Sequence, residues 1–258
     1  MGTGWSEDLS YDYFSRIVKT LQEQFVLLQM GDAPTRVARD EPYAIVRHDL
    51  DVCPHRGLRM AQLEHSLGLQ STYMMLLDSP FYDVDSAASR AAIQEIGNLG
   101  HEVGLHFDID SYPPGQVWDA ATLDKCVAES ADRLSQVSGL PVRSFSFHRP
   151  IPEFLRGETY IGGLVNSYAT DLMDWYISDS KGNWREGEPL PQLLPPKGPL
   201  LQILIHPIWW GPEPLAPEDR LEIFRNELCA ITPGADYAKV GQLIYDVLVV
   251  RPRPALSH

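Results

Sequence analysis

The sequence predicts an α/β fold with a mainly parallel sheet, because strand-like and helix-like segments alternate along most of the chain. Short apolar runs bounded by turn residues are typical of buried strands, and apolar residues at three- and four-residue spacing are typical of amphipathic helices. The length of 258 residues suffices for one large domain or two small ones. A barrel and an open sheet with helices on both faces would both fit this alternation.

The elements that we expect are short and regularly spaced. In chain order they are a helix over 13–28, a strand over 43–46, a helix over 57–67, a strand over 71–77, a helix over 86–99, a strand over 102–105, a helix over 122–137, strands over 142–147 and 200–205, and helices over 221–228 and 240–248. Ser86 is a favoured N-cap, and Gly68 and Gly100 follow two of the helices, where glycine is favoured.

The chain shows no convincing internal boundary. Residues 168–199 are less regular and rich in Gly, Pro and Trp, but no linker, repeat or low-complexity tract divides the sequence. We therefore expect a single domain over 1–258, with an N-terminal helix and lead-in over 1–42, a motif-bearing core over 43–210 and C-terminal helices over 211–258.

The composition excludes several classes of protein. The net charge of −14 argues against sequence-independent binding of nucleic acid and against docking on an anionic membrane. Three scattered cysteines indicate no disulfide framework and no cysteine metal site. The first residues lack the basic start and apolar core of a signal peptide, so we expect a cytoplasmic protein. The oligomeric state is not predicted.

The most informative segment is Arg47-His48-Asp49-Leu50-Asp51, which closes the apolar run over 43–46. Side chains alternate along a strand, so Asp49 and Asp51 point to the same side. Two neighbouring carboxylates are costly unless a cation, a proton or hydrogen bonds offset their repulsion. One of them could hold a metal while the other acts as a base, although Asp is also common at helix N-caps and turns.

Further polar groups follow the later strands. The expected strands end in His106-Phe107-Asp108, in His148-Arg149-Pro150 and in His206-Pro207. A single histidine after a strand is usually a capping or packing residue, but functional groups of parallel α/β folds gather at the carboxyl ends of the strands. Together with the Asp pair, these histidines predict a catalytic metal site for hydrolysis, with Asp and His ligands that suit a divalent cation, zinc first.

In this order the motifs resemble those of the polysaccharide deacetylases, the NodB-homology group of carbohydrate esterases. The resemblance is closer to a divergent branch that has His-Asp-x-Asp in place of Asp-Asp and is often associated with bacterial surface-polysaccharide synthesis. The segments Ser144–Pro150 and Ile177–Trp184 also resemble that branch. The resemblance implies a single-domain distorted (β/α) barrel. It also implies metal-dependent removal of an N-acyl group, an N-acetyl group in the first instance, from a sugar or sugar conjugate.

The resemblance also implies roles for individual residues. These roles are Asp49 as general base, Asp51 and His106 as metal ligands, Arg149 as the residue that orients the base, and His206 as general acid. The family places a second histidine four residues after the first, but that position here is Asp110. The third ligand could be His148, Asp108 or Asp110, and we favour His148 because imidazole suits zinc.

Substrate contacts and alternatives complete the expectations. Asp179 and Trp184 could recognise a sugar hydroxyl and a sugar face, and Trp209 and Trp210 could form an apolar wall for an acetyl methyl, although ordinary aromatic packing is an equal alternative. His101 is expected to be a structural residue, and His48 is expected either in the core or in contact with a site residue. The alternative functions are hydrolysis of another non-peptide C–N bond and carbohydrate binding without turnover.

Overall fold

The computed structural model describes residues 8–37, 42–150, 152–155, 157–184, 186–231, 236–245 and 248. Its nine strands form one sheet: β1 (Val26–Leu28), β2 (Tyr43–Leu50), β3 (Thr72–Leu76), β4 (Glu102–Asp108), β5 (Ser144–His148), β6 (Tyr160–Ile161), β7 (Leu164–Asn166), β8 (Trp175–Ser178) and β9 (Leu200–Ile205). The order is β6-β7-β5-β4-β3-β2-β9-β8, and β1 lies beside the first half of β2.

The predicted α/β class is confirmed. Every strand pair is parallel except β6–β7. The strand order is an open path that ends in β6 and β8, which do not pair with each other among the described strands. The barrel implied by the sequence motifs is therefore incomplete.

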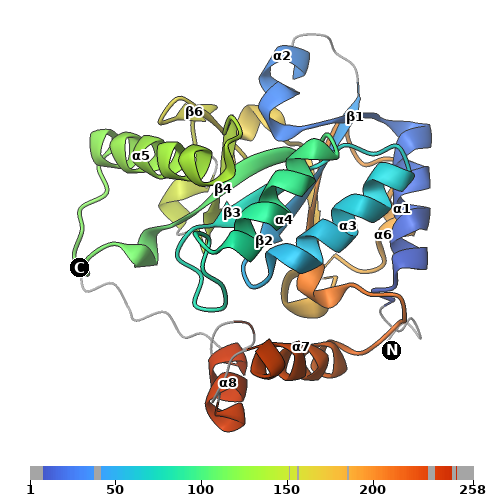
Figure 1. Ribbon diagram of the computed structural model, residues 1–258. Coiled ribbons are helices and arrows are strands. Elements are labelled where there is room, and N and C mark those ends of the chain that lie inside the picture. Colours follow the sequence, from blue (N-terminus) through green and yellow to red (C-terminus); the bar gives the residue numbers. More distant parts are fainter. Residues whose placement is uncertain are drawn as a thin grey trace.

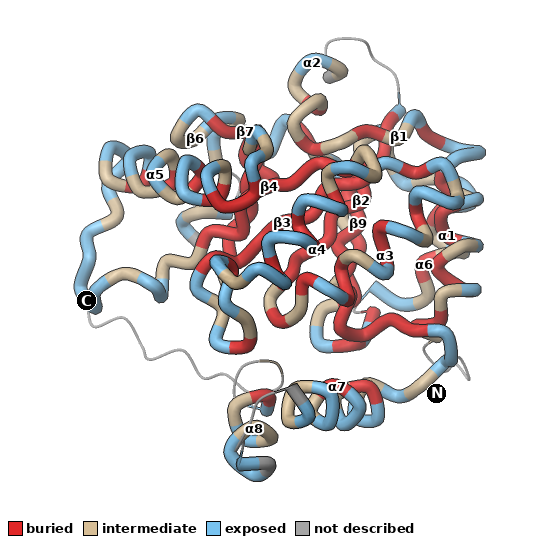
Figure 2. Tube along the Cα trace, in the orientation of Figure 1, coloured by how far each residue is buried: buried red, intermediate tan, exposed pale blue. Residues whose placement is uncertain are grey.

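Eight α-helices among the described residues accompany the sheet. They are α1 (Tyr11–Gln24), α2 (Ala33–Val37), α3 (Pro54–Ser66), α4 (Ala87–Asn98), α5 (Ala120–Ser138), α6 (Pro189–Gln192), α7 (Pro217–Ile231) and α8 (Tyr237–Ile244). Figure 1 shows α3 and α4 in front of the sheet, with α7 and α8 set apart below it. The central strands are buried along their whole length, whereas the helices are exposed on their outer sides (Figure 2). Within the described residues, no helix is long and apolar enough to cross a membrane.

The opening segment differs from the prediction. The helix expected over 13–28 ends at Gln24, and Val26–Leu28 form β1, which pairs in parallel with Tyr43–Ile45. Phe25 already has an extended backbone, with φ −137° and ψ 154°. The apolar residues of this segment fit either structure, and pairing with β2 decides the outcome. The other expected elements are present with shifted ends, except that the last part of the helix expected over 240–248 lies outside the described residues, and the irregular region 168–199 contains β8.

The alternation of side chains along β2 separates the core from the polar site. Ala44, Val46 and Leu50 belong to the large apolar core. Tyr43 and Ile45 belong to a smaller apolar cluster on the opposite face. Because the period of a strand is two, Arg47 and Asp49 share the face of Tyr43 and Ile45, nearer the carboxyl end of the strand.

His48 and His101 lie in the core, as expected. His48 is fully buried, with its Nε2 2.6 Å from Glu64 Oε1 of α3, and its ring stacks on Tyr73. The backbone N–H of Ser71 donates to His101 Nδ1 over 3.1 Å. The Glu64 carboxylate also accepts hydrogen bonds from the Ser71 and Tyr73 hydroxyls. This buried polar cluster therefore ties β2, β3 and α3 together.

Candidate active site

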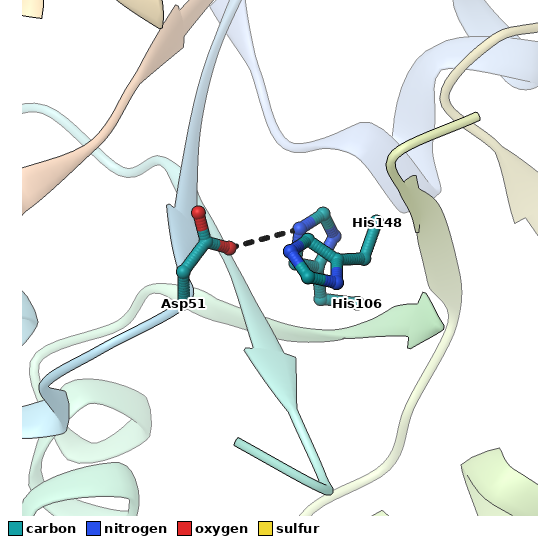
Figure 3. A group of neighbouring side chains, drawn as sticks. All are labelled: Asp51, His106 and His148. Atoms are coloured by element: carbon teal, nitrogen blue, oxygen red, sulfur yellow. Dashed lines mark ion pairs between the residues drawn. The ribbon is translucent and has the colours of Figure 1, made fainter. Parts of the chain in front are cut away.

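Three side chains from three strand ends form a group that could hold a divalent cation. Asp51 follows β2, His106 lies on β4 and His148 ends β5. One possible ligand atom from each lies within 4.8 Å of the others. Figure 3 shows the three side chains together, with His106 Nε2 3.1 Å from Asp51 Oδ1. All three are residues that the sequence predicted as ligands.

The register between β4 and β5 brings the next polar residues into place. Asp108 is the register partner of His148, and its Oδ2 lies 2.9 Å from His148 Nδ1. Asp110 instead pairs with Arg149, with 3.4 Å between Oδ2 and Nη1, and its side chain is 58% exposed. Of the three candidates for the third ligand, His148 is therefore the one grouped with Asp51 and His106, and Asp108 lies beside it.

The donor set fits a divalent cation. Asp51 Oδ1 and His148 Nδ1 are buried atoms, and their polar neighbours are His106 Nε2 and Asp108 Oδ2, which belong to residue types that also bind metals. Burial by itself would raise the pKa of Asp51, but His106, His148 and His206 hold that pKa well below its usual range. An ionised carboxylate with two imidazoles is a typical ligand set for zinc and related metals.

Arg47 holds the proposed base, a role that the sequence motifs assigned to Arg149. The Arg47 guanidinium is completely buried, and its Nε and Nη2 lie 3.1 and 3.2 Å from the two carboxylate oxygens of Asp49. Its Nη1 donates to Gln202 Oε1 over 2.6 Å. Arg149 has a left-handed backbone, with φ 56°, and pairs with Asp110. Arg47 is thus an arginine in direct contact with Asp49, and the orienting role expected of Arg149 stays a prediction.

His206 follows β9 and is held by a buried carboxylate. Its Nδ1 lies 2.6 Å from Asp179 Oδ1, and its backbone N–H donates to both oxygens of Asp179. Trp210 Nε1 donates to Asp179 Oδ2 over 2.7 Å. Burial alone would lower the pKa of His206, but Asp179, with Asp51 and Asp49 as lesser contributors, raises that pKa to about 9. The imidazole is therefore protonated near neutral pH.

The expected substrate contacts of four residues do not match their positions. Asp179 is fully buried and occupied by His206 and Trp210, so it does not face a sugar hydroxyl. Trp184, Trp209 and Trp210 are 3%, 3% and 1% exposed. The rings of Trp184 and Trp210 pack edge to face, 6.1 Å between centroids. The packing alternative therefore describes the three tryptophans, whose faces are covered by the core.

Arg47, and the pairing of Asp179 with His206, are functional features that the sequence reasoning missed. Arg47 carried a signal, because strand alternation places it on the same face as Asp49. The Asp179–His206 contact joins residues 27 apart in sequence. Only the pairing of β8 with β9 brings these two residues together.

Comparisons with known proteins give the following results. No sequence-family profile and no curated protein matches the chain. BA3943 of Bacillus anthracis, a CE4 family pseudoenzyme, is 12% identical over 73% of this chain and 61% of its own, with a TM-score of 0.41. The Streptococcus pyogenes deacetylase PplD, in complex with acetate, is 11% identical over 86% and 92% of the two chains, with a TM-score of 0.43. A family 4 acetyl xylan esterase of Clostridium thermocellum, in complex with a cobalt ion, is 17% identical over 77% and 91%, with a TM-score of 0.36.

These structural neighbours are carbohydrate esterases, deacetylases or pseudoenzymes of the family that the sequence motifs resemble. The chain spans less than two thirds of the length of BA3943. With identities and TM-scores this low, only the side chains of the site bear on the function.

Proposed function

We propose that this protein is a metal-dependent hydrolase that removes an N-acyl group, an N-acetyl group in the first instance, from a sugar or sugar conjugate. The observation that carries the proposal is the grouping of Asp51, His106 and His148 beside a carboxylate held by an arginine. A protonated histidine from another strand end completes a set of ligands, base and acid.

The proposed chemistry assigns different residues to the two atoms of the scissile bond, the acyl carbon and the amine nitrogen. Asp51, His106 and His148 would hold a divalent cation, zinc first, which would supply Lewis-acid polarisation of the acyl carbonyl and of the attacking water. Asp49, aimed by Arg47, accepts the proton of that water. His206, kept protonated by Asp179, donates a proton to the departing amine nitrogen.

The substrate class is proposed from the resemblance of the ordered motifs to polysaccharide deacetylases. Metal ligands, base and acid alone would serve any amide, so the sugar is the part that most needs a direct test. The zinc identity, the cytoplasmic setting and a role in surface-polysaccharide synthesis remain predictions from the sequence.

The test is acetate release by the zinc-loaded protein from three kinds of substrate: N-acetylglucosamine oligomers, a nucleotide-linked N-acetyl sugar and a simple N-acetyl amide. We expect release from at least one of the two sugar substrates. Asp49→Asn should lower the rate by about 10²–10⁴-fold with zinc still bound, the usual loss for a general base. Asp110→Asn, an exposed carboxylate near the site, is the matched control and should keep most of the rate.

The alternatives give different results. Release from the simple amide alone would favour another C–N hydrolase. Zinc and sugar binding without any acetate release would favour a carbohydrate-binding protein. A protein that takes up no divalent metal would refute the proposal.

A further inference from the structure

Ser146 lies between the proposed base and a proposed metal ligand. It is a fully buried residue in the middle of β5, and its register partner on β4 is His106. Strand alternation places its side chain on the same face as that of His148.

Its hydroxyl contacts both functional groups. Ser146 Oγ lies 2.7 Å from His106 Nδ1 and 3.4 Å from Asp49 Oδ1. An ionised carboxylate only accepts hydrogen bonds, and a hydroxyl has a single proton to donate. The Ser146 hydroxyl therefore donates to Asp49, and its lone pair accepts the Nδ1–H of His106.

This direction of donation fixes the tautomer of His106. With a proton on Nδ1, the Nε2 atom of the neutral ring carries the free lone pair. That Nε2 is the atom that lies 3.1 Å from Asp51 Oδ1, where a bound cation would replace the proton that the two atoms otherwise share. Histidines that bind metals commonly have their other nitrogen held in this way by a carboxylate, a carbonyl or a water.

We propose that Ser146 is a positioning residue that couples the metal site to the base. It directs Nε2 of His106 towards the cation, and it gives Asp49 a hydrogen-bond donor in addition to Arg47. The inference rests on the proposed role of His106 as a ligand. Its consequence is that loss of one hydroxyl weakens cation binding and base alignment together, although Ser146 touches neither cation nor substrate.

Ser144 supplies a matched control on the same strand and the same face. It is also fully buried, and its hydroxyl donates to Glu102 Oε1 over 2.8 Å, away from the metal group. Ser144→Ala and Ser146→Ala each remove one buried hydroxyl from β5. If buried serines matter here only for stability, the two variants should behave alike.

The first measurement is the affinity for Zn²⁺ alone, by competition with a chelating dye, with the melting temperature of each variant recorded beside it. We expect Ser146→Ala to bind zinc about 10–100-fold more weakly than the wild type. Removal of a residue that hydrogen-bonds to a metal ligand commonly lowers metal affinity by this factor. Ser144→Ala should keep the wild-type affinity. Ser146→Thr, which retains the hydroxyl, should restore most of it.

The second measurement uses the zinc-loaded wild-type protein. Nitrogen-15 NMR of the imidazoles should find a proton on Nδ1 of His106. A proton on Nε2 of His106 would overturn the inference, as would equal zinc affinities for well-folded Ser146→Ala and wild type. A wild-type protein that binds no zinc would refute the proposed function instead.

Discussion

The substitution Asp179→Asn keeps the shape of the side chain at position 179. It should nevertheless remove most of the general-acid function of His206. Asp179 is the main group that raises the pKa of His206 from 6.5 to about 9, against the effect of burial. Without this carboxylate the pKa should fall towards its ordinary value of 6.5, because burial opposes the smaller contributions of Asp51 and Asp49. At about pH 7.5 a pKa near 6.5 leaves about a tenth of the molecules protonated, against nearly all of them in the wild type. We expect at least a tenfold loss of kcat at this pH and a smaller loss in more acidic buffer.

The direct assay is an NMR titration of the His206 imidazole in the metal-free protein, followed by the pH dependence of kcat in the loaded protein. In the wild type, activity should decline as the pH rises through the pKa of His206, and in Asp179→Asn this decline should begin at lower pH. Asp171→Asn removes an exposed carboxylate from the same region and controls for net charge. An unchanged titration in Asp179→Asn would refute the reasoning, because some other group would then hold the proton.

Three further predictions test the metal group, the base and the core. By elemental analysis, His148→Ala should retain at least tenfold less zinc than Asp110→Ala. Equal zinc contents in the two variants would contradict the assignment of His148 as a ligand. Arg47→Met removes the buried guanidinium beside Asp49 and should cost about 3–5 kcal/mol in denaturant unfolding; a loss of activity without a loss of stability would mean that the pair does not stabilise the fold. Glu64→Gln should cost about 1–3 kcal/mol, because a well-satisfied buried acceptor is disrupted, and should leave zinc affinity unchanged.

The local pattern of the sequence predicted the alternating elements and the strand ends that bear His106, His148 and His206. Those features depend on periodicity within a few residues, which a sequence displays directly. The strand at Val26–Leu28 could not be separated from the preceding helix, because its identity depends on pairing with β2. The sequence also did not predict which tryptophans are buried, because exposed and packed tryptophans look alike in a sequence. Trp210, for example, packs against Phe14 and Trp184.

The sharing of one strand face by Arg47 and Asp49 has a consequence for how such a site can evolve. Because Arg47 and Asp49 both lie on β2, their backbone positions cannot move apart without disrupting the sheet. Substitutions after β5 that leave the sheet intact should therefore leave the contact between Arg47 and Asp49 intact as well.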